Sequence, residues 1–144
     1  MPAMGKTNWS RVVLGGLVAG VVINGIEWGV HGVLLHREWT AAFTALGKAI
    51  PARIWPLFII PGNFLFGILA LYFYAAVLRP RYGPGPKTAL YAGLAAWAVF
   101  FLIPIMAQIP LELFPNRLQF TVIGMGLVDV VLGTLLGAWF YREA

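Results

Sequence analysis

Five polar side chains lie inside stretches of sequence that are otherwise almost purely apolar. Asn24, Glu27 and His31 share the first stretch, Asn63 lies in the second and Asp129 in the last. At ~100° per residue, the first three fall on one face of a helix. Titratable groups inside a membrane typically mark ion paths, proton relays or ligand sites. These five residues are therefore the candidate ligand-binding or proton-relay residues.

The two asparagines and the two carboxylates are expected at a common depth. With a helical rise of ~1.5 Å per residue, these four side chains lie within roughly 6 Å of the membrane midplane, and His31 lies nearer the outer surface. Two carboxylates at one level cannot both ionise without a cation or water beside them. His31, one helical turn after Glu27, is the expected hydrogen-bond partner of that carboxylate.

Four stretches are long enough to hold these side chains inside a bilayer, at about 12–35, 54–78, 88–110 and 118–141. Each is close to the ~20 residues that a membrane-crossing helix requires. The chain is 60% hydrophobic and only 10% charged, whereas a soluble domain carries about 25% charged residues. The sequence predicts an all-α membrane protein in which residues 1–144 form one domain, an antiparallel bundle of four transmembrane helices.

The segment between the first two stretches is expected to be a short amphipathic helix at the membrane interface. Trp39, Phe43 and Leu46 recur there at helical spacing, and Gly47 could end the helix. A plain loop is the alternative. Between the second and third stretches, the prolines and glycines of residues 79–87 predict a stiff, basic turn.

Small residues at four-residue spacing indicate where helices approach one another closely. Such residues occur in the first, second and fourth stretches, beside the polar residues. The expected helix-packing positions are Gly16, Gly20, Gly67, Gly126, Gly133 and Gly137.

Basic residues at the ends of the apolar stretches set the expected orientation. With the N-terminus inside, the cytoplasmic side carries Lys6, Arg11, Arg79, Arg81, Lys87 and Arg142, and the outer side carries Arg37, Lys48, Arg53 and Arg117. The sequence therefore predicts a multi-pass protein of the cell inner (plasma) membrane with both termini cytoplasmic. The positive residues are scattered, so the net charge of +5 indicates no nucleic-acid partner.

Several segments resemble a class of small bacterial four-span inner-membrane proteins. The likeness is carried by RVVLGGLVAGVVINGIEWGVHGVLL, REWTAAFTALGK, RPRYGPGPKTALYAGLAAW and GAWFYRE, which together cover most of the chain. The resemblance implies an inner-membrane location and this size, and it implies no activity or functional residue.

No nucleophile stands beside a base and no nucleotide-binding glycine loop is present, so we expect no enzyme and assign no catalytic residue. The expected role is an accessory or scaffolding subunit of a larger membrane complex, respiratory or photosynthetic, or a binder of a lipophilic ligand. Its partners would be the lipid bilayer and other membrane subunits or a second copy of the chain.

Three alternatives remain open from the sequence. The polar residues could serve only to join helices. Glu27 and Asp129 could instead serve a small oligomeric proton-coupled transporter. His31 could meet a haem, a chlorin or a quinone; Glu27, His31 and Asp129 could also supply metal ligands, but no motif supports a metal site and none is assigned.

Overall fold

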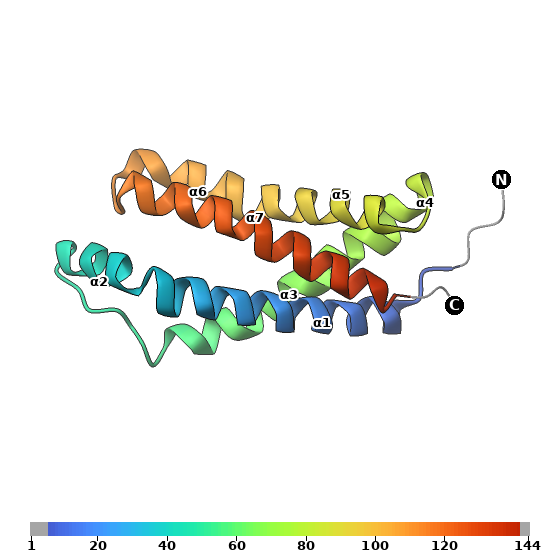
Figure 1. Ribbon diagram of the computed structural model, residues 1–144, viewed down its shortest axis with the longest axis horizontal. Coiled ribbons are helices and arrows are strands. Elements are labelled where there is room, and N and C mark those ends of the chain that lie inside the picture. The colour runs from blue at the N-terminus through green and yellow to red at the C-terminus, as the bar shows by residue number, and fades with distance from the viewer. Residues whose placement is uncertain (1–5, 142–144) are drawn as a thin grey trace.

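The computed structural model describes residues 6–141, in which four helices are long and apolar enough to cross a membrane. They cover Trp9–Leu34, Trp55–Tyr82, Pro86–Leu111 and Asn116–Trp139. Successive helices run in opposite directions, so the start of the first and the end of the last lie at the same end of the molecule (Figure 1). Helix is the only regular structure within the described residues, which confirms the predicted all-α four-span architecture.

Three of the four spans change from α-helix to π-helix along their length. In the first span, α1 (Trp9–Glu27) continues as the π-helical segment η1 (Trp28–Leu34). The second and third spans make the same change, from α3 (Trp55–Tyr72) to η2 (Phe73–Leu78) and from α5 (Pro86–Trp97) to η3 (Ala98–Leu102). A π-helix bonds each residue to the fifth one along, so its turns are wider, and such segments are frequent at functional sites.

The predicted short helix between the first two spans is α2 (His36–Ala45), and the loop alternative is wrong. It follows η1 almost without interruption, at the end of the molecule opposite the start of α1 (Figure 1). Ala42 is buried against the rest of the protein, whereas Arg37, Glu38 and Thr44 are exposed. Its contacts with the bundle therefore come from one face, as the amphipathic pattern predicts.

The second span ends later than the predicted residue 78, because α4 (Arg79–Tyr82) extends it by one turn. Pro80 lies within this continuation and does not end the helix. The chain reverses instead at Gly83 and Gly85, whose φ angles of 80° and 131° suit glycine.

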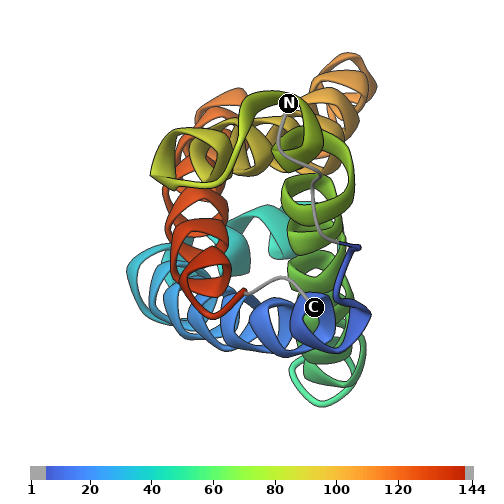
Figure 2. The ribbon, with the colours of Figure 1, turned by 90° about the vertical axis from the view of Figure 1, so that its right-hand side faces the viewer.

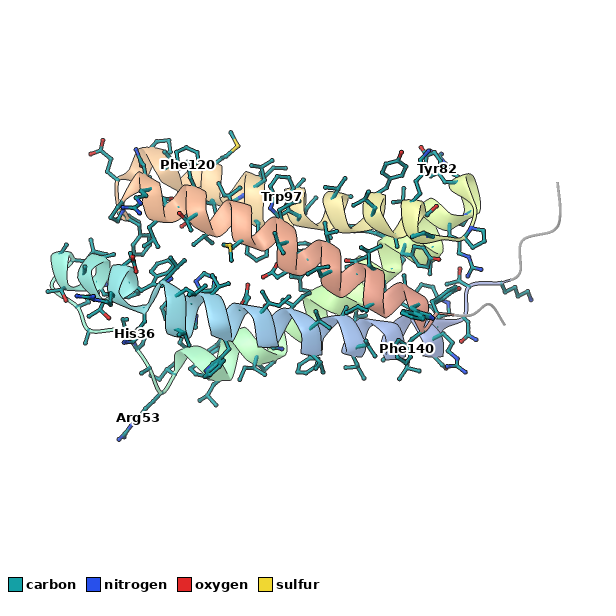
Figure 3. All side chains as sticks on the ribbon, in the orientation of Figure 1. His36, Arg53, Tyr82, Trp97, Phe120 and Phe140 are labelled. Atoms are coloured by element: carbon teal, nitrogen blue, oxygen red, sulfur yellow. The ribbon has the colours of Figure 1, made fainter. Side chains whose placement is uncertain are left out.

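The four spans form a ring in which α1 contacts α3 and α7 (Asn116–Trp139), and α5 contacts α7 and η2 (Figure 2). The third span finishes with α6 (Ile103–Gln108) and the short 3₁₀ segment η4 (Ile109–Leu111). Trp97 lies near the middle of the molecule (Figure 3), where its indole Nε1 donates to the backbone O of Ile123 on α7 at 2.8 Å.

Glycines set the close approach of α1 to α3. A methyl group added at Gly67 would collide with the carbonyl oxygen of Gly16, and one added at Gly16 would collide with the backbone of Ile68. At Gly20 the added carbon would lie 2.8 Å from the Cα of Phe64. The two backbones are therefore too close for any larger residue at these three positions.

Glycines of α7 make equivalent contacts on its two sides. An added methyl group at Gly137 would meet the carbonyl oxygen of Gly15, and one at Gly133 would lie 2.9 Å from Ile23. At Gly126 it would lie 2.5 Å from the ring of Phe101, in the third span. All six glycines expected to pack helices thus lie at helix contacts.

Candidate functional site

Asn63 joins the first two spans by two hydrogen bonds. Its Nδ2 donates to Oδ1 of Asn24 at 3.0 Å and to Oε2 of Glu27 at 2.8 Å. Its side chain is buried, with 8% exposed, whereas Asn24 and Glu27 are half-buried on the facing helix. Three of the five candidate residues are therefore in direct contact, across the α1–α3 interface.

The amide of Asn24 fixes the other side of this contact. Its Nδ2 donates to the carbonyl oxygen of Gly20, one turn earlier in α1, at 3.0 Å. It also donates to the carbonyl oxygen of Ile60 in α3 at 3.3 Å. Both amide groups thus use their N–H donors inside the bundle, and only their carbonyl oxygens remain, of which Oδ1 of Asn24 already accepts from Asn63.

Asp129 contributes a second carboxyl group from α7. It is 3% exposed, and its Oδ1 has no hydrogen-bond partner among residues 6–141. The carboxyl of Glu27 is near enough to interact with it electrostatically. We call Asn24, Glu27, Asn63 and Asp129 the polar cluster; its members come from three different spans, all of which turn these side chains toward the protein interior.

His31 does not pair with Glu27, contrary to the expectation from their spacing. Its Nδ1 accepts a hydrogen bond from the indole Nε1 of Trp39 on α2, at 2.9 Å. The α-helix ends at Glu27, and the wider turns of η1 place His31 at a different angle around the axis than an α-helix would. His31 therefore belongs to the contact between the first span and α2.

The metal-ligand alternative is also wrong for these residues. Within residues 6–141, no three histidine, cysteine, aspartate or glutamate side chains gather closely enough to hold a metal ion. Glu27, His31 and Asp129 therefore do not form the three-ligand set that the sequence left open.

Aromatic rings fill the space beneath α2. Trp39 lies edge-on to Trp55 and Phe114, with ring centroids 5.9 Å and 5.4 Å away. Phe43 contacts both of those rings and Trp39. We call Trp39, Phe43, Trp55 and Phe114 the aromatic cluster. Together with His31, it attaches α2 to the first span, to the start of α3 and to the segment before α7. The sequence indicated Trp39 and Phe43 but not their partners, because the spacing within one helix does not reveal contacts between helices.

Gln119 is a buried polar residue that the sequence analysis missed. It is 4% exposed, its Nε2 donates to the backbone O of Phe114 at 2.9 Å, and its Oε1 has no partner. A cavity of about 780 Å³ lies nearby, between α2 and the start of α7, with Glu38, Glu112 and Arg117 in its lining. The sequence feature that could have identified Gln119 is an amide side chain in the first turn of an otherwise apolar span.

Comparisons with protein-family models, with curated proteins and with solved structures give no match. The likeness to small bacterial four-span proteins accordingly stays an expectation.

Proposed function

We propose that the protein is a non-enzymatic membrane protein that binds a lipophilic ligand, with the ligand's polar group at the polar cluster, as an accessory subunit of a larger membrane complex. The observation that carries this proposal is the buried Oδ1 of Asp129, which lacks a partner beside the bonded Asn24, Glu27 and Asn63. A buried polar atom left without a partner costs about 1–3 kcal/mol.

A purely structural role accounts poorly for this arrangement. A hydrogen bond between transmembrane helices is worth on average only about 0.6 kcal/mol, and Asn24 and Asn63 already provide such bonds. A central carboxylate costs about 2.5–3.5 kcal/mol on insertion scales. Within residues 6–141, Oδ1 of Asp129 makes no hydrogen bond across a helix contact that would offset this cost. A bound polar group would supply the missing partner.

A panel of small amphiphiles that share one apolar part and differ in head group would test the proposal. We expect at least one of an alcohol, a carboxylate, an amine and a quinone to raise the melting temperature of the protein in neutral lipid nanodiscs by several degrees. The rise should be lost in Asp129→Asn and kept in Glu38→Gln, which changes an exposed carboxylate on α2. Equal responses of the two variants, or no response to any head group, would contradict ligand binding at the cluster.

Proton-coupled transport is the second candidate, favoured by the electrostatic contact between Glu27 and Asp129. Four spans are few for a transporter, so this function requires an oligomer. Proton uptake into proteoliposomes that is lost in Glu27→Gln would support it over simple binding.

For localisation, we propose the inner (plasma) membrane with both termini cytoplasmic. The end of the molecule that holds the start of α1 and the α4 turn carries Lys6, Arg11, Arg79, Arg81 and Lys87, against Arg37, Lys48, Arg53 and Arg117 at the other end. Arg142, which also favoured this orientation, lies outside the described residues.

A further inference from the structure

The hydrogen-bonding inventory of the polar cluster limits what it can bind. An amide has two N–H donors and one carbonyl acceptor, and an ionised carboxylate only accepts. Both donors of Asn63 are used, to Asn24 and Glu27, and both donors of Asn24 are used, to Gly20 and Ile60. The cluster therefore has no N–H group left to offer a ligand.

With both carboxyl groups ionised, as they would be beside a bound cation, the groups that remain are all acceptors. Oδ1 of Asp129 is buried and has no partner. Within the part of the chain that the structure describes, no hydrogen bond reaches the carbonyl oxygen of Asn63 or the second carboxyl oxygen of Glu27. In that ionised state, a carboxylate, a phosphate or a quinone carbonyl would find only other acceptors at this place, whereas a ligand with several N–H donors would satisfy them.

The charge of the cluster favours a cation for the same place. Glu27 and Asp129 interact electrostatically, and among residues 6–141 neither forms an ion pair with a lysine, arginine or histidine. His31 in η1, the nearest titratable neighbour along the first span, has its Nδ1 engaged by Trp39. A cation between two carboxyl groups in a low-dielectric interior gains far more Coulomb energy than one in water.

The surroundings favour an organic cation over a metal ion. Within residues 6–141, no three histidine, cysteine, aspartate or glutamate side chains gather here. One turn after Asn63, Phe66 packs on Phe100 with ring centroids 4.6 Å apart, and Ile23 and Val130, the neighbours of Asn24 and Asp129, lie in the same apolar cluster. Glu27 remains half-buried, so one edge of the polar cluster is accessible from outside the bundle.

We infer that the polar cluster binds the protonated amine of a lipophilic amine, with its N–H groups donating to Asp129, Glu27 and Asn63 and its apolar part against the neighbouring aromatic and aliphatic side chains. This inference rests on the proposed ligand-binding function and names the chemical class of that ligand.

Four probes that share a phenylpropyl group test the inference: 3-phenylpropylamine, its N,N,N-trimethyl derivative, 3-phenylpropanol and 3-phenylpropanoate. Each is titrated calorimetrically into the full chain in nanodiscs of a neutral lipid, with empty nanodiscs as the blank. We expect the amine to bind at least tenfold more tightly than the other three. The trimethyl derivative keeps the positive charge but has no N–H group, and the alcohol and the carboxylate carry no positive charge.

Two variants separate this site from the rest of the membrane surface. Asp129→Asn and Glu27→Gln should each weaken amine binding at least tenfold, and Glu38→Gln should leave it unchanged; two site variants keep the test valid if one fails to fold. Equal binding of the trimethyl derivative would overturn the inference, as would displacement of the amine by sodium or potassium ions at constant ionic strength.

The failure of this inference is distinct from failure of the proposed function. Binding of the alcohol or the carboxylate alone would overturn the amine while leaving a lipophilic-ligand binder. Absence of binding by every probe would remove both.

Discussion

Asn63 carries the contact on which the polar cluster depends. Its one nitrogen donates to Asn24 and Glu27 on the facing helix, at 3.0 Å and 2.8 Å. Because all three groups are withdrawn from water, the loss of the donor would leave two acceptors without partners. The side chain thus fixes both the packing of α3 on α1 and the position of the Glu27 carboxyl.

Replacement of Asn63 by leucine is expected to lower the free energy of unfolding by about 1–3 kcal/mol for each acceptor left unpaired. Asn63→Asp should be at least as damaging, since it replaces the donor by a third carboxyl beside Glu27. Reversible unfolding in mixed micelles measures both. The control is Asn116→Ala, at an exposed position where α7 begins, which should change stability little. A neutral Asn63→Leu would mean that the two hydrogen bonds contribute nothing.

At the scale of elements, the spans and their glycine faces could be predicted, and the local helix type could not. The length of an apolar stretch alone identifies a transmembrane helix, and the small size of Gly16 and Gly67 indicates a close helix contact. The π-helical segments leave no such pattern, because a chain surrounded by lipid has no strong polar face whose period could reveal them. The expected pairing of His31 with Glu27 is wrong for that reason, because it assumes α-helical spacing and η1 begins one residue after Glu27.

Two glycines on α3 provide a matched test of the helix contact. Gly67→Ala would place a methyl group against the carbonyl oxygen of Gly16, so we expect a loss of about 1–3 kcal/mol of stability from overpacking. Gly62→Ala lies on the same helix with nothing within 4 Å of the added carbon. It should be neutral or stabilising by up to ~1 kcal/mol, because alanine is the better helix former. Thermal unfolding of the two variants under one condition measures the difference. Equal losses of stability in both would show that the glycine contact is unimportant.

At the scale of the whole molecule, the proximity of Asn24, Glu27, Asn63 and Asp129 could be predicted from the sequence, because helix rise and span midpoints determine depth. Which of these side chains touch could not be predicted, because the rotation of each helix about its axis is set by the neighbouring helices. The burial of Gln119 could not be predicted for a related reason, since it comes from packing of the chain around Phe114.

The absence of cysteine from the sequence makes the proposed orientation directly measurable. Lys48→Cys, between α2 and α3, should react with a membrane-impermeant maleimide added outside intact cells. Lys87→Cys, at the start of α5, should react only after the membrane is permeabilised. Both variants should be labelled fully in detergent, which serves as the control. Reversed labelling in intact cells would place both termini outside.

Apart from the contact of Gly126 with Phe101, the glycine contacts lie toward the end where α1 begins, and there they bring the backbones of α1, α3 and α7 together. Toward the end that bears α2, α1 meets α3 through amides and a carboxyl, and α2 meets Trp55 of α3 and Phe114, just before α7, through aromatic rings. Main-chain contacts leave no side-chain rotamers to adjust, whereas longer side chains can rearrange. Entry of a guest molecule should consequently widen only the α2 half, with the glycine-packed half acting as the pivot.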